Sequence, residues 1–191
     1  MIRYEAFMEI ADELLQKITD IIQHRQDVIK LACSQRSKFE HWLKFELAAA
    51  IAQSYGANNI LIEPPYPTGG KADLSLQAKK QTWYVELKTS NTNWRAEGVE
   101  NKIRPITMNI NNIILDIHKL REKSQPSRGI MAFILFPVPL RIWHDEREKL
   151  IRHLDRIEEQ CNLAAGSLVK QSNFLQVAPS YGILAFVVEA N

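Results

Sequence analysis

Two short stretches of this sequence place carboxylates and a lysine where they could act together. Asp73 lies in one stretch of alternating polar and apolar residues, and Glu86 and Lys88 lie in the next. Successive side chains of a β-strand point to opposite faces of a sheet, so Glu86 and Lys88 share a face. Two carboxylates beside a lysine suit a hard divalent cation and a polarised water. The spacing therefore predicts a site for metal-assisted hydrolysis.

The two stretches are predicted to form an antiparallel hairpin. Between them runs a short polar segment, residues 77–81, which is typical of a tight turn. If the turn is centred between Lys79 and Lys80, Asp73 lies directly opposite Glu86. Opposed residues on one face have Cβ atoms roughly 4.5–5.5 Å apart. Carboxylates that close repel each other unless they share a proton or a cation, which favours a metal site over a plain polar surface.

Few ligands are needed for the cation that this register predicts. Mg²⁺ takes oxygen ligands and is often held by only one or two protein carboxylates. Asp73, Glu86 and the backbone carbonyl of Leu87 could supply them. The same register sets Lys71 opposite Lys88, whose ammonium could position an attacking water and offset charge on a phosphate. We therefore expect Mg²⁺ or Mn²⁺ as the cofactor.

This pattern resembles the motif of the PD-(D/E)XK nuclease superfamily, which has the restriction-endonuclease-like fold. Asp73 matches the motif aspartate and residues 86–88, Glu-Leu-Lys, match the (D/E)-X-K element, whereas Ala72 stands where the motif often has proline. The resemblance covers about residues 39–137. It implies a metal-dependent nuclease that hydrolyses phosphodiester bonds, in the first instance a DNA endonuclease of restriction, repair or defence type.

An acidic residue on the preceding helix is expected to complete the site. Residues 39–55 are predicted to form a helix that ends at Gly56, and Glu46 stands within its apolar stripe. A lone carboxylate is costly to bury without a partner or a cation. The superfamily commonly has a glutamate on this helix close to the metal. Glu46 is therefore the expected third acidic residue, with Glu40 and Glu63 as the other candidates; alternatively, Glu46 emerges at the edge of the stripe and pairs with another charge.

The segment that follows the lysine is expected to contact the substrate. It leaves the second strand of the hairpin directly and carries aromatic and basic side chains among asparagines. Such side chains suit contacts with nucleic acid, although a solvated connection would have the same composition. The residues expected to bind nucleic acid, DNA first, are Lys71, Trp94, Arg95, Lys102 and Arg104.

Periodicity and turn signals predict both helices and strands, and the resemblance implies an α/β fold with a central mixed β-sheet flanked by helices. The restriction-endonuclease-like core would occupy residues 39–137, within a single domain. A long N-terminal helical extension (1–35) and a C-terminal helix and hairpin (138–191) would be added to this core. The expected helices are 4–32, 39–55, 106–123 and 144–161, and the expected strands are 59–63, 71–77, 82–89, 129–136, 173–178 and 183–189.

The first helix leaves a second hypothesis open. Its apolar residues, Leu14 and Ile18 among them, recur at steps of three and four. This stripe can pack along its own domain, or it can join two copies of the chain in a homodimer. The alternative to a nuclease is accordingly a catalytically inactive nucleic-acid-binding or assembly module that retains the nuclease fold.

Composition bounds the remaining classes of function. The net charge of +2 over 191 residues is too small to indicate nucleic-acid binding by itself, so any basic footprint must be local. Cys33 and Cys161 lie far apart and form no disulfide framework, which is consistent with a reducing cytoplasm. The longest apolar run is too short to cross a bilayer. We therefore expect a cytoplasmic protein without a membrane partner.

Overall fold

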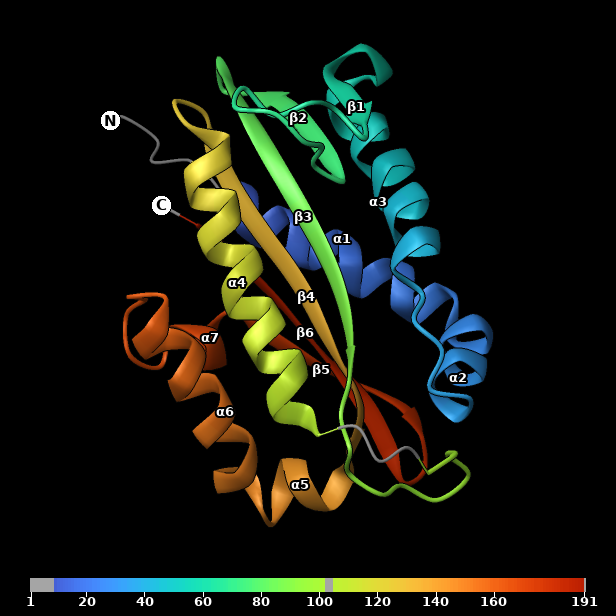
Figure 1. Ribbon diagram of the computed structural model, residues 1–191. Coiled ribbons are helices and arrows are strands. Elements are labelled where there is room, and N and C mark those ends of the chain that lie inside the picture. The colour runs from blue at the N-terminus through green and yellow to red at the C-terminus, as the bar shows by residue number, and fades with distance from the viewer. Residues whose placement is uncertain (1–8, 102–104, 191) are drawn as a thin grey trace, which may run out of the picture.

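The computed structural model describes residues 9–101 and 105–190, and within them six strands form one mixed sheet (Figure 1). The strand order is β1-β2-β3-β4-β6-β5. Neighbouring strands are antiparallel except β3 and β4, which are parallel. The predicted mixed α/β architecture is therefore confirmed. The strands are β1 (Ile60–Ile62), β2 (Leu74–Ala78), β3 (Gln81–Asn91), β4 (Arg128–Pro139), β5 (Ser172–Ala178) and β6 (Tyr181–Glu189).

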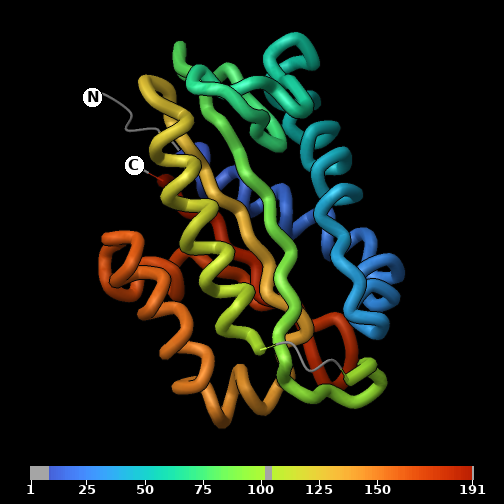
Figure 2. The backbone as a smooth tube through the Cα atoms, in the orientation of Figure 1, coloured from blue at the N-terminus to red at the C-terminus, as the bar shows by residue number. Residues whose placement is uncertain are grey.

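Helices cover both faces of this sheet, as the chain trace in Figure 2 shows. One face packs against α1 and α3, and the other packs against α4 and α6, so each face has its own hydrophobic cluster. Strand β4 is buried along almost its whole length, as its continuous apolar run predicts. The helices are α1 (Ile10–His24), α2 (Gln26–Ser34), α3 (Glu40–Tyr55), α4 (Ile106–Ser124), α5 (Leu140–His144), α6 (Arg147–Gln160) and α7 (Ser167–Lys170), with a 3₁₀ turn η1 (Ala57–Asn59).

The hairpin between β2 and β3 has the predicted register. Ala78 pairs with Gln81, and Lys79 and Lys80 form the turn with positive φ values of 52° and 64°. A two-residue turn with both φ angles positive is the type I′ geometry, whose twist matches that of the flanking strands. The ladder ends at the pair of Leu74 and Val85, one step before Asp73 and Glu86.

The predicted first helix, 4–32, is divided within the described residues into α1 and α2, and the break falls at Arg25. Arg25 is also the residue that interrupts the apolar repeat. Leu14 and Ile18 are buried in the cluster that α1 shares with α3, β5 and β6. Among the described residues, intramolecular packing therefore buries most of the stripe that was considered for a homodimer.

Other boundaries differ from the sequence prediction for identifiable reasons. Strand β2 begins at Leu74, because residues 64–72 turn back on themselves through the positive φ angles of Gly69 and Gly70. Strand β4 continues past Pro137 at a shift in its register with β6, a position where a sheet tolerates proline. The predicted C-terminal hairpin is confirmed as β5 and β6. No helix among the described residues combines the length and the apolar character that crossing a membrane requires.

Candidate metal centre

The Asp73 carboxylate lies where β2 separates from β3. Beyond Val85 no described strand pairs with this edge of β3, and the backbone amide of Leu87 donates instead to Oδ2 of Asp73 (2.9 Å). This hydrogen bond holds the carboxylate against the strand. The amide and the carbonyl of one strand residue point to the same edge. The Leu87 carbonyl therefore also faces the edge where Asp73 lies, as the predicted ligand set requires.

Glu86 lies beside Asp73 and is largely buried, with 15% of its side chain exposed. The hydroxyl of Tyr66 donates to Oε1 of Glu86 (2.6 Å). Burial and the neighbouring negative charge of Asp73 raise the pKa of Glu86 to about 7, against the opposing effects of Tyr66 and Lys119. The register thus brings the two carboxylates together as predicted, in a place where a shared proton or cation is favourable.

Lys88 shares a face of β3 with Glu86, and α4 covers that face. The Lys88 ammonium forms an ion pair with Asp116 of α4. One turn further along α4, Nζ of Lys119 lies 3.6 Å from Oε1 of Glu86. Asp116 and Lys119 thus bring two charged groups of α4 to this face of β3. The three charged groups of the motif are thus gathered between β3 and two charged side chains of α4.

A buried lysine on α3 also reaches the carboxylates. Nζ of Lys44 lies 2.8 Å from Oε1 of Glu63 and 3.5 Å from Oδ1 of Asp73. Burial lowers the pKa of Lys44, but the contacts with the two acids outweigh it, so the pKa is raised overall. Sequence reasoning missed this role of Lys44. The available signal was a charged residue within a largely apolar helix, and Lys44 met that criterion as well as Glu46 did.

Within the described part of the chain, Glu46 contacts neither Asp73 nor Glu86 and pairs with Arg25 instead, as the alternative interpretation of this residue expected. Its carboxylate lies 3.3 Å from a guanidinium nitrogen of Arg25 and is 37% exposed. Helix α3 is apolar on nearly all sides, and such a helix does not identify which face meets the sheet. The two other candidates lie closer: Glu63 pairs with Lys44, and Glu40 accepts the backbone amide of Thr89 (2.9 Å).

The residues predicted to bind nucleic acid are not gathered at one place. Lys71 does not lie opposite Lys88, because the 64–72 turn carries it to within 3.8 Å of Glu63 instead. Trp94 is half-buried, with its ring centroid 6.3 Å from that of His153 on α6. Arg95 is exposed. The other two predicted contacts, Lys102 and Arg104, lie outside the described residues.

The donor set fits a cation that needs few protein ligands. Among the described residues, no three His, Cys, Asp or Glu side chains converge as a metal-binding group. Asp73, Glu86 and the Leu87 carbonyl nevertheless provide two carboxylates and one neutral oxygen. Mg²⁺ keeps most of its waters or binds substrate phosphate, and it is commonly held by such a small set. The site therefore suits Mg²⁺ or Mn²⁺ better than Zn²⁺, which prefers nitrogen and sulfur ligands.

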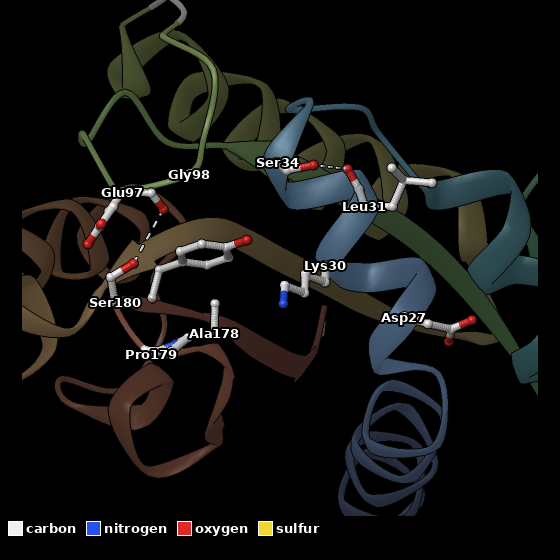
Figure 3. A pocket seen from close by; sticks show the side chains of 10 residues that line it. Asp27, Lys30, Leu31, Ser34, Glu97, Gly98, Ala178, Pro179 and Ser180 are labelled. Carbon is white, nitrogen blue, oxygen red and sulfur yellow. Dashed lines mark hydrogen bonds between the residues drawn. The ribbon is translucent and has the colours of Figure 1, made fainter.

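A pocket of about 580 Å³ lies elsewhere, between α2, residues 97–98 and the turn from β5 to β6 (Figure 3). The hydroxyl of Ser180 donates to the carbonyl of Glu97 across one side of it (3.4 Å). Its lining is mainly apolar and shares no residue with the carboxylate site. This pocket therefore adds nothing to the chemistry of Asp73 and Glu86.

No protein-family model matches this chain, and no curated protein or solved structure matches it either. Its function is therefore inferred from the side chains around Asp73 and Glu86.

Proposed function

We propose that this protein is a metal-dependent nuclease, in the first instance a DNA endonuclease, with a restriction-endonuclease-like core. The observation that carries the proposal is the pairing of Asp73 with Glu86 at the point where β2 separates from β3. A buried pair of like charges weakens a fold unless a proton or a cation compensates it. A divalent cation that binds substrate phosphate gives this pair a function.

The order of the elements supports the same proposal. Helix α3, strands β1 to β3, helix α4 and strand β4 follow one another as helix, three strands, helix and strand. This is the order that the resemblance implies for residues 39–137. The carboxylates lie on the hairpin of the three-strand unit, and both flanking helices contribute charged side chains to them.

Each side chain has a distinct part in the proposed hydrolysis. Asp73 and Glu86, with the Leu87 carbonyl, would hold Mg²⁺ or Mn²⁺. When bound, the cation would polarise the phosphate and lower the pKa of an attacking water. Lys88 projects from the same face as Glu86, so its ammonium is placed to orient that water and to offset charge on the phosphate. Lys44 neutralises part of the acidic charge beside Asp73 and keeps that carboxylate oriented.

A plasmid-cleavage assay tests this proposal. Supercoiled plasmid is incubated with the purified protein while Mg²⁺ and then Mn²⁺ are titrated, with a chelator as the blank. We expect nicking or linearisation that Lys88→Ala reduces by roughly 10²–10⁴-fold, the usual contribution of a positioned acid–base group. Asp73→Asn, which keeps an acceptor for the Leu87 amide, should abolish it.

Lys30→Ala is the matched control, because Lys30 is an exposed lysine of α2, a helix that packs into the same hydrophobic cluster as α1 and α3, and among the described residues no contact joins it to the carboxylate site. It should cleave as the wild type does. All variants should retain the wild-type circular dichroism melt. Absence of cleavage of plasmid, single-stranded DNA and RNA by the wild type with both metals would exclude the nuclease proposal.

One observation favours the alternative, a nucleic-acid-binding or assembly module without catalysis. Lysines already meet the acids of the site: Lys44 contacts Asp73, Lys119 contacts Glu86, and Lys88 contacts Asp116. If these ion pairs replace the cation, the protein will not bind Mn²⁺. Calorimetric titration of Mn²⁺ into the wild type and into Asp73→Asn separates the two functions, since a nuclease should show binding that the substitution removes.

A further inference from the structure

A second pocket, of about 480 Å³, lies at the N-terminal end of α4. It is formed by the segment after β3, the first turn of α4 and one side of α6. Among the residues that the structure describes, no acidic side chain lines it. The lining residues are Asn93, Trp94, Ile106, Thr107, Lys149, Arg152, His153 and Arg156.

The α6 side of this pocket is a basic stripe, made of Lys149, Arg152, His153 and Arg156. Positions i, i+3, i+4 and i+7 lie on one side of a helix. Lys149 is neutralised by Glu146, but no described acidic residue forms an ion pair with either arginine. Burial lowers the pKa of His153, and the charges of the two arginines lower it further. The stripe therefore carries positive charge that the protein does not compensate within the pocket.

The opposite side of the pocket holds an aromatic ring in a fixed position. The guanidinium of Arg36 donates to the carbonyls of Thr92 and Trp94 (2.8 Å to the latter) and so anchors the backbone on both sides of Asn93. The ring of Trp94 is tilted by 49° to that of His153. A positioned aromatic ring beside arginines is the arrangement with which proteins bind single-stranded or unpaired nucleotides. The uncapped first turn of α4 adds a positive helix end to the same wall.

We propose that this pocket binds a phosphodiester of nucleic acid, with Arg152 and Arg156 on the phosphate and Trp94 against a base. Arginine suits this role because its planar guanidinium can hold two phosphate oxygens at once. The identity of the polymer rests on the proposed nuclease function. Thr107 lies about 14 Å along α4 from Asp116, the partner of Lys88. A strand bound at the carboxylates would therefore reach the pocket within a few nucleotides of the scissile bond.

Fluorescence anisotropy of the full chain with labelled oligonucleotides tests this inference. A fluorescein-labelled duplex and the corresponding single strand are titrated in EDTA, which prevents metal-dependent cleavage, at several salt concentrations. Arg152→Gln/Arg156→Gln removes the two charges but keeps most of each aliphatic stem. We expect it to raise Kd about tenfold or more and to lower the log–log salt slope by about 2, one for each lost phosphate contact.

Lys30→Gln/Lys38→Gln is the matched control, because it removes two exposed charges from the α2 region. It should leave the salt slope unchanged. Equal weakening by the two double variants would show general electrostatic attraction and would overturn the pocket. Competition by poly-glutamate as strong as that by unlabelled oligonucleotide would overturn it too, since the site would then not select phosphodiesters.

Tryptophan fluorescence adds a readout that a purely structural role would not change. Binding of unlabelled single strand should quench the protein's emission, and Trp94→Phe should remove most of that change while three other tryptophans remain. A full quench in Trp94→Phe would overturn the stacking role. Arginine-dependent binding without cleavage of plasmid, single-stranded DNA or RNA would support the pocket and exclude the nuclease. Cleavage and Kd both unchanged in the arginine double variant would exclude the pocket and leave the nuclease proposal standing.

Discussion

The two faces of β3 differ sharply although their residues alternate along one strand. Trp83, Val85 and Leu87 are buried in the hydrophobic cluster that also contains side chains of α1 and α3. Glu86 and Lys88, on the other face, are 15% and 19% exposed and are held in ion pairs with α4. The first face accounts for the position of the strand. The second places charges in a poorly solvated space where apolar residues would pack more favourably, and this is the arrangement on which the proposed function rests.

The two edges of β3 also differ: one is paired within the sheet, and the other bonds to side chains. On one edge β4 pairs with β3 up to Asn91 and Phe136, so the backbone groups there are used by the sheet. On the other edge the pairing with β2 stops at Leu74, the first residue of that strand. Beyond it, the carboxylates of Asp73 and Glu40 accept hydrogen bonds from the backbone amides of Leu87 and Thr89. The site thus lies where this edge of β3 is no longer paired with β2, so that its backbone groups can bond to side chains and ligands.

The largest expected effect on stability comes from the apolar face. Leu87→Ala should destabilise the protein by about 2–5 kcal/mol, because the residue is buried among α3 and sheet side chains. Its backbone carbonyl, on the edge of the strand, is unchanged, so Mn²⁺ affinity and cleavage per folded molecule should persist. Urea denaturation measures the first quantity, and calorimetry and the plasmid assay measure the others.

Leu115→Ala is the matched control for this comparison. Leu115 lies on α4 with 64% of its surface exposed, so its loss should change the free energy of unfolding by no more than about 0.5 kcal/mol. If Leu87→Ala abolished Mn²⁺ binding in a folded protein, the two faces of β3 would not be independent.

Local signals were sufficient to predict the hairpin that carries the motif. Alternation assigned Glu86 and Lys88 to one face, and the short polar segment around Lys79 and Lys80 set the register. Both depend on neighbours in the chain, and both are confirmed. Burial of β4 followed in the same way from its uninterrupted apolar run. The placement of Asp73 beside Glu86 could therefore be predicted without knowledge of the tertiary structure.

Contacts between distant elements could not be predicted in this way. Helix α3 is apolar on nearly every side, so its sequence did not show that Lys44, and not Glu46, meets the sheet. Tyr66 lies in a turn whose path depends on the conformations of two glycines, Gly69 and Gly70. Its hydrogen bond to Glu86 closes a separation of 20 residues, and no periodicity encodes it.

The second prediction concerns the charged face. Because burial and Asp73 raise the pKa of Glu86 to about 7, this group costs stability when it is ionised in the folded protein. The raised pKa means that protonated Glu86 contributes to the free energy of unfolding. This contribution is fully present below the ordinary glutamate pKa of about 4.3 and is lost as the pH rises through about 7. Glu86→Gln should therefore raise the melting temperature in EDTA at pH 8 by several degrees, and by much less at pH 5. Circular dichroism melts at the two pH values measure the difference.

Bound metal should reverse the order of the two melting temperatures, so that the wild type becomes more stable than Glu86→Gln. Saturating Mn²⁺ at pH 8 is expected to raise the melting temperature of the wild type and to leave Glu86→Gln nearly unchanged, since only the native carboxylate pair binds it. Glu122→Gln, on the exposed side of α4, is the control and should not alter the pH dependence. A lower melting temperature for Glu86→Gln than for the wild type at pH 8 in EDTA would show that Lys119 and Tyr66 fully compensate the buried charge.

The smallest effect is expected from the hydroxyl that steadies this carboxylate. Tyr66→Phe removes the donor to Oε1 of Glu86 and leaves the buried ring in place. The loss should be about 1.5–3 kcal/mol at pH 8, where the acceptor is charged, and smaller at pH 5, where Glu86 is protonated. Combined with Glu86→Gln, it forms a double-mutant cycle measured by urea denaturation at both pH values. A coupling energy that grows with pH would show that Tyr66 acts on the ionised carboxylate. Strict additivity would mean that the ring packs beside Glu86 without stabilising its charge, and compensation of the buried acid would then fall to Lys119.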